Sequence, residues 1–135
     1  MQIGHHQSLE WYDAWTLAAI LAAVPNGDDV SLTRLIAVAD GLNHAIINRS
    51  ELELAMGRLI EAGYVRITAS GFAATSKAAG LNVQGVGSYI QRVSEAIGAR
   101  HWAPATQIPK TTAASYVTVE AYEQAVRHYV RKHGV

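Results

Sequence analysis

The chain has 135 residues, of which half are hydrophobic and 16% are charged, so its composition is that of a globular domain rather than a disordered chain. Eleven basic and eleven acidic residues give a formal net charge of zero, which excludes a strongly basic nucleic-acid coat protein. The absence of cysteine excludes disulfides, thiolate metal sites and cysteine nucleophiles. The N-terminus shows no secretory leader and no apolar run is long enough for a bilayer, so we expect a cytoplasmic protein with no membrane partner.

The charge is divided unevenly along the chain. Residues 1–62 carry eight acids and three arginines, whereas residues 63–135 carry eight basic residues and three acids. This asymmetry is typical of two docked subregions or of a polar surface for a partner, although chance also produces it in a small protein.

The first predicted helix, at Asp13–Val24, carries two apolar stripes. One stripe consists of Leu17, Ile20, Leu21 and Val24, and the other of Trp11, Trp15, Ala18, Ala19 and Ala22. A helix that is apolar nearly all round is buried on more than one side. Its second face therefore needs a cover, either the C-terminal part of the same chain or a second subunit. The second option makes Trp11 and Trp15 candidates for self-association.

Two further helices follow in the first half. Ser31 is the predicted N-cap of the second helix. The sequence Ser50-Glu51-Leu52-Glu53 matches a capping box, so the third helix is predicted to begin at Ser50. Its predicted buried residues are Leu52, Ala55, Met56, Leu59 and Ile60. Gly63 is placed to end this helix in a left-handed conformation.

A two-stranded hairpin is predicted at Tyr64–Ile67 and Phe72–Thr75, followed by a short helical turn that Ser76 caps. Val83, Val86, Ile90, Val93 and Ile97 then recur at helical spacing. Residues 99–117 are predicted to be a long connection, in which Trp102 is packed rather than part of a recognition surface. The last helix is predicted to start after Thr118 and to bury Val119, Tyr122, Val126 and Tyr129, with Ala125 beside them.

The stretch SELELAMGRLIEAGYVRITASGFAAT, residues 50–75, resembles the winged helix-turn-helix superfamily. In that pattern a capped third helix ends in Leu-x-x-x-Gly-Tyr-Val and runs directly into the wing. The resemblance covers about residues 13–81 and implies a mainly α fold with a small two-stranded β wing. It divides the chain into a winged-helix-like domain, 1–81, and a helical extension, 82–135, which packs on that domain or forms a dimer interface. In many members the third helix enters the DNA major groove.

The charges of the third helix argue against this use. Its predicted outward positions are Glu51, Glu53, Leu54, Gly57, Arg58 and Glu61, which are three carboxylates and one arginine. Duplex binding depends on cations that replace the counterions of the phosphates, so an acidic face is repelled. The residues that could still contact nucleic acid are Arg49, Arg58, Arg66 and Lys77.

Motifs of enzymes and metal sites are missing from the sequence. There is no nucleophile elbow, phosphate-binding loop or paired-histidine zinc motif, and Asp28-Asp29 is interpreted as a solvated turn. His128 and His133 are five apart, which is not the spacing at which a helix shares a metal, and His44 is interpreted as structural. The sequence therefore predicts no enzyme, no metal and no cofactor. The first hypothesis is a winged-helix interaction module that forms a homodimer, and the alternative is a dimeric DNA-binding transcriptional regulator.

Overall fold

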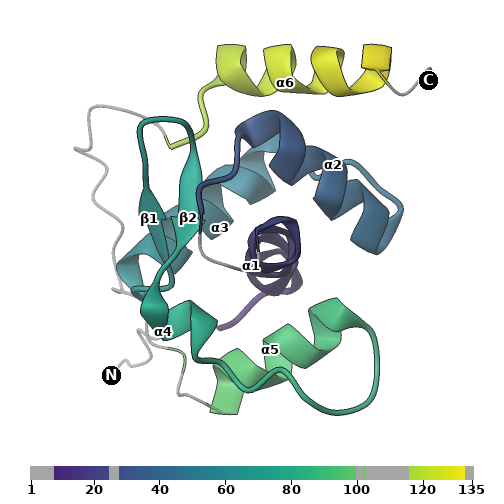
Figure 1. Ribbon diagram of the computed structural model, residues 1–135. Helices are drawn as coiled ribbons and strands as arrows, with labels where there is room; N and C mark the ends of the chain where they lie inside the picture. Colours follow the sequence, from purple (N-terminus) through teal and green to yellow (C-terminus); the bar gives the residue numbers. More distant parts are fainter. Residues whose placement is uncertain (1–7, 25–27, 100–101, 103–115, 133–135) are drawn as a thin grey trace, which may run out of the picture.

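The computed structural model describes residues 8–24, 28–99, 102 and 116–132 (Figure 1). In chain order the elements are α1 (Trp11–Ala23), α2 (Leu32–Asn43), α3 (Arg49–Glu61), β1 (Val65–Ile67), β2 (Phe72–Ala74), α4 (Ser76–Ala79), α5 (Tyr89–Ala99) and α6 (Val119–Lys132). This arrangement confirms the predicted fold class, mainly α with a three-helix core, a small two-stranded wing and further C-terminal helices. No helix in the described ranges has both the length and the apolar character that crossing a membrane requires.

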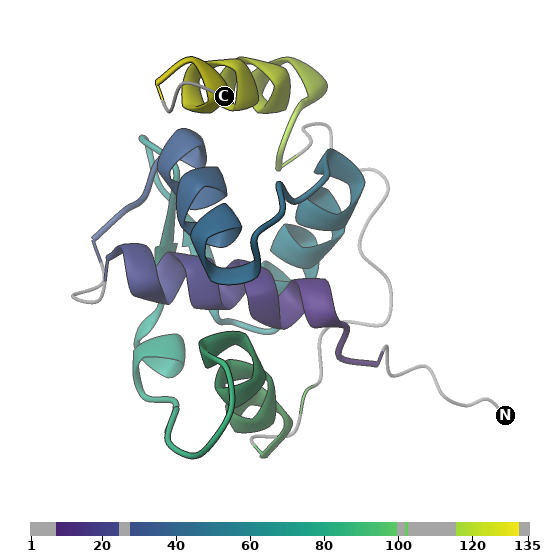
Figure 2. The same cartoon turned by 90° about the vertical axis from the view of Figure 1, so that its right-hand side faces the viewer.

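Helix α1 lies at the centre of the molecule. Figure 2 shows it running across the middle, with α2 and α3 on one side and α5 on the other. Residues 13–20 are all buried, because helices pack against α1 from more than one side. The C-terminal part of the same chain contributes to this cover through α5, which packs against α1. Helix α6 packs on α2, on the side away from α1.

The two tryptophans proposed for self-association have different environments. Trp15 is 5% exposed, and its indole Nε1–H donates a hydrogen bond of 2.8 Å to the carbonyl oxygen of Ala39 in α2. The prediction that Trp15 lies on an intermolecular surface is wrong, because the core of its own chain encloses it. Trp11, in the first turn of α1, remains 48% exposed.

The caps of α2 and α3 were predicted with different success. Ser31 caps α2 as expected, since its Oγ accepts the backbone N–H of Arg34 at 3.2 Å. Helix α3, however, begins at Arg49, and Asn48 is its cap, with Oδ1 accepting the N–H of Glu51 at 2.9 Å. The predicted capping box at Ser50 is wrong because Asn48 has the extended backbone of a cap, while Ser50 is already inside the helix.

Replacing Asn48 by alanine is expected to lower the free energy of unfolding by about 1 kcal/mol, because the N–H of Glu51 loses its acceptor. Ser50→Ala is the matched control two residues later, and it should change stability by less than about 0.5 kcal/mol. Urea denaturation of both variants measures the difference. A loss at Ser50 and none at Asn48 would place the helix start at the capping box instead.

A single glycine, Gly63, ends α3 and directs the chain into the wing. Gly63 has φ 87°, a left-handed conformation that glycine adopts without a steric penalty. Its N–H donates to the carbonyl of Ile60 at 3.0 Å, and the N–H of Tyr64 donates to that of Leu59 at 2.9 Å. These are the two hydrogen bonds of a Schellman motif, and they turn the chain directly into β1 as predicted.

The wing is a short antiparallel hairpin that pairs Val65 with Ala74 and Ile67 with Phe72. The segment before α2 joins it, since Val30 and Phe72 exchange backbone hydrogen bonds of 2.7 and 3.0 Å. A Cβ on Gly71 would lie 2.0 Å from the carbonyl oxygen of Val30, so only glycine allows this close approach. The wing is thus fixed to the start of α2 as well as to the end of α3.

The C-terminal elements differ from the prediction in their boundaries. Thr75, not Ser76, caps α4, because its Oγ1 accepts the N–H of Ala78. Helix α5 begins at Tyr89, so Val83 and the exposed Val86 lie outside it, where Gly85 and Gly87 both have positive φ. The cap of α6 at Thr118 is confirmed, since its Oγ1 accepts the N–H of Ala121 at 3.1 Å. In α6, Ala125 is buried and Tyr122, Val126 and Tyr129 are partly buried, whereas Val119 is exposed.

Candidate functional site

The first turns of α3 are where a DNA-reading helix would present donors to the duplex. In this chain the same region binds the segment that leads into α6. The two carboxylate oxygens of Glu53 accept the backbone N–H groups of Val117 at 2.6 Å and Tyr116 at 3.2 Å. The guanidinium of Arg49 donates to the carbonyl oxygen of Val117 at 2.8 Å. Both side chains are therefore used inside the chain, and we call this set of contacts the α3 clamp.

Two tyrosines of α6 extend this attachment toward α2. The hydroxyl of Tyr122 donates to the carbonyl oxygen of Ile47 at 2.5 Å, just before α3. The hydroxyl of Tyr129 donates to the carboxylate of Asp40 near the end of α2, and this hydrogen bond raises the pKa of Tyr129. Polar contacts thus join α6 and its leading segment to α2, to the connection that follows α2, and to α3.

Arg58 was predicted to face outward, and this prediction is wrong. The residue is 7% exposed, and its guanidinium lies 3.0 Å from the carboxylate of Asp13 in α1. It also donates to the carbonyl oxygen of Ser8 and lies 5.6 Å from the ring centroid of Trp102. The side chain is buried because α1 and Trp102 enclose it.

Trp102 packs against the hydrophobic core, as predicted from the sequence. Its ring stacks on that of Tyr64, with centroids 6.4 Å apart and an angle of 12° between the planes. Asp13 is the ion-pair partner of Arg58. Burial raises the pKa of Asp13 to about 6, although the hydrogen bond from the Glu10 backbone and the charge of Arg58 both lower it. The Asp13–Arg58 pair therefore belongs to the structural core between α1 and α3.

The remaining basic candidates lie near the wing. Lys77 donates to the carbonyl oxygen of Ala62 at 2.6 Å, and its ammonium group is 4.5 Å from the ring centroid of Tyr64. Arg66 on β1 is exposed, and its side chain makes no hydrogen bond or ion pair with the described residues. Three of the four predicted nucleic-acid contacts, Arg49, Arg58 and Lys77, thus have intramolecular partners.

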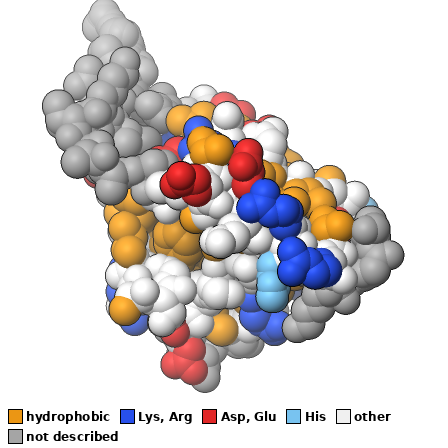
Figure 3. Space-filling model, turned by 90° about the horizontal axis from the view of Figure 1, so that it is seen from above, with side chains coloured by type: hydrophobic (Ala, Val, Ile, Leu, Met, Phe, Trp, Pro, Cys, Tyr) orange, Lys and Arg blue, Asp and Glu red, His pale blue; other side chains and the backbone are white. Residues whose placement is uncertain are grey.

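A groove that the sequence did not indicate lies between the first turns of α2 and helix α6, with a volume of about 910 Å³. We call it the α2–α6 groove. It is lined by Ser31, Leu32, Thr33, Arg34, Ala37, Ala121, Gln124, Ala125, Arg127, His128, Tyr129 and Arg131. Figure 3 shows this face of the molecule, where basic side chains gather around a histidine. Among the described residues, none of those that line the groove is acidic.

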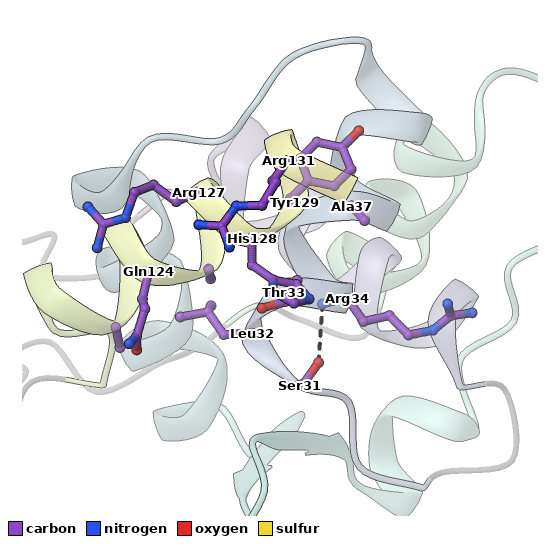
Figure 4. A pocket seen from close by; sticks show the side chains of 12 residues that line it. Ser31, Leu32, Thr33, Arg34, Ala37, Gln124, Arg127, His128, Tyr129 and Arg131 are labelled. Carbon is purple, nitrogen blue, oxygen red and sulfur yellow. Dashed lines mark hydrogen bonds between the residues drawn. The ribbon is translucent and has the colours of Figure 1, made fainter. Parts of the chain in front are cut away.

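Figure 4 shows how the charged side chains are distributed along the α2–α6 groove. Arg34 and Arg127 extend in opposite directions, and His128 and Arg131 lie between them in this view. No carboxylate of the described residues forms an ion pair within 4.0 Å with any of these side chains. The basic C-terminal half of the sequence was a signal for this surface, but nothing in the sequence pairs α6 with α2.

The histidines and acids do not form a metal centre in the part of the chain that the structure describes, where no three potential ligands come together. His44 is exposed and ends α2 with φ 56°, which agrees with its interpretation as a structural residue. His5, His6, His101 and His133 lie outside the described residues. Comparison with protein-family models, with curated proteins and with solved structures finds no match for this chain.

Proposed function

We propose that this chain is a non-enzymatic winged-helix interaction module that binds protein partners, including a second copy of itself. The α3 clamp is the observation that carries the proposal. A helix that reads DNA needs free donors for base edges and phosphates. Here Arg49 is used in the clamp, Arg58 is paired with Asp13, and the exposed side chains of α3 include the acid Glu61.

Exposed apolar side chains support self-association. Trp11 and Leu54 are each 48% exposed, and Ile46 and Val119 are also exposed. Large apolar side chains at the surface are typical of contact sites when they are contiguous. A symmetric dimer is the commonest closed assembly, and it would cover such residues on both copies. Because Trp15 lies in the core, self-association is proposed from Trp11 and from the other exposed apolar side chains, Leu54, Ile46 and Val119.

Sedimentation tests the self-association directly. We expect a dimer at about tens of micromolar protein, the range in which a modest interface is populated. Trp11→Ala should shift the equilibrium toward monomer, whereas Arg66→Gln on the wing should leave it unchanged. A wild-type chain that stays monomeric over this range would contradict self-association.

Electrophoretic shift with pooled genomic duplex fragments tests the other half of the proposal. We expect no tight, sequence-specific complex, because the basic residues of α3 are engaged inside the chain. Any weak binding should tolerate every sequence, fade steeply as salt rises, and weaken in Arg66→Gln. A nanomolar complex on a defined palindrome at physiological salt would instead support the dimeric transcriptional regulator.

A further inference from the structure

We propose that the α2–α6 groove docks an acidic, partly apolar segment of a partner protein. This inference rests on the proposed interaction module and gives the chemistry of its partner. Three arginines and one histidine surround the groove, and none of them pairs with a carboxylate of the described chain. The cationic side chains of the groove are therefore available to pair with the carboxylates of a partner.

The floor of the groove favours a protein segment over a phosphate chain. It is lined by the half-buried Leu32 and Ala37 of α2 and by Ala121 and the buried Ala125 of α6. The small side chains of the alanines leave room for the backbone of another chain to approach. Apolar surface is stabilised by contact with apolar groups, which a hydrated phosphodiester does not supply. A peptide can place apolar side chains on this floor and carboxylates on its rims at the same time.

The positions of the cations indicate a segment rather than a small molecule. Arg34 and Arg127 extend in opposite directions, with His128 and Arg131 between them in the view of Figure 4. Guanidinium groups bind carboxylates through paired hydrogen bonds, so each arginine can recognise one Asp or Glu side chain. Several acids spaced along one chain match this distribution, whereas a single small anion could reach only part of it.

Selection from a random peptide display library on the immobilised wild-type chain tests the proposal. We expect enriched peptides to contain an excess of Asp and Glu interleaved with apolar residues. A fluorescent copy of an enriched peptide should bind Arg131→Gln about fivefold more weakly than wild type, and Arg127→Gln/Arg131→Gln more weakly still. Arg66→Gln removes the same charge from the wing and should bind like wild type.

The groove variants are suited to this test because the side chains of Arg127 and Arg131 are exposed and make no hydrogen bond or ion pair with the described residues. Their thermal melts should match that of wild type, which separates lost binding from lost folding. Binding of the enriched peptide should also weaken as salt rises, since the contacts are ionic and exposed.

Five results would overturn the inference. The enriched peptides could be non-acidic, or they could bind the double variant as tightly as wild type. Either result would mean that the chain binds its partner at a site other than the groove. Failure to enrich any peptide would remove the acidic segment as the occupant, while sedimentation and the duplex assay still judge the proposed function. Tighter binding of random single-stranded or duplex DNA, lost in the double variant, would make the groove a nucleic-acid site. Loss of self-association in the double variant would make a second copy the occupant.

Discussion

Arg58→Met is expected to lower the free energy of unfolding by about 3–5 kcal/mol at neutral pH, because it leaves the Asp13 carboxylate buried without its cation. Methionine keeps much of the side-chain volume, so the loss reports charge more than packing. The double variant Asp13→Asn/Arg58→Met should recover a large part of the loss, since no unpaired charge remains. Glu61→Gln, an exposed charge change on the same helix, should have little effect.

Urea denaturation of this set measures the coupling between the two residues. Equal losses in Arg58→Met and in the double variant would show that the arginine acts by packing alone. In that case Trp102, rather than Asp13, would be the neighbour that matters for Arg58.

The same pair predicts a pH dependence of stability. Burial raises the pKa of Asp13 from 3.8 to about 6, so the folded chain holds this proton more tightly than the unfolded chain does. The contribution of Asp13 is therefore fully present below pH 3.8 and is lost as the pH rises to about 6. The stability of wild type relative to Asp13→Asn should fall across this window and then level off. A rise across the same window would mean that the attraction of Arg58 outweighs the cost of burial.

Leu59→Ala is expected to cost about 2–5 kcal/mol, because the residue is fully buried on the face of α3 that also carries Leu52 and Met56. Truncation removes apolar contacts and leaves a cavity that the surrounding helices fill only in part. Leu54→Ala on the same helix is the matched control, since Leu54 is exposed and its loss should cost about 0.5 kcal/mol or less.

Thermal or urea unfolding of the two leucine variants, at a protein concentration where the chain is monomeric, checks the assignment. Similar losses for Leu54 and Leu59 would show that α3 is rotated relative to the core described above.

Periodicity was sufficient to predict the helices, the wing and most of the core. The glycine at 63 and the hydroxyl caps at Ser31 and Thr118 were also predictable, because each acts on backbone groups within a few residues. The start of α3 was not, since Asn48 and Ser50 are both good caps and only the backbone conformation distinguishes them. Local chemistry thus predicts an element better than it predicts where that element begins.

The candidate site was much less predictable, because its contacts join distant parts of the sequence. An arginine on an acidic helix is expected to be exposed. Arg58 is buried instead because Asp13 faces it from α1, which the sequence does not reveal. Glu53 was assigned to a local cap, but its partners are the backbone groups of Tyr116 and Val117. The α2–α6 groove depends on the packing of two helices that no sequence pattern connects.

The central position of α1 has a consequence for how the chain unfolds. The winged portion cannot bury α1 alone, since α5 packs on the face of α1 away from α2 and α3. A chain truncated after Leu81 would expose that face to solvent, so the winged portion and α5 should melt in a single cooperative transition. Helix α6, which reaches the core through α2 and the α3 clamp, can separate without uncovering α1. In hydrogen exchange its amides should therefore open before those of α1, as a distinct unit of lower local stability.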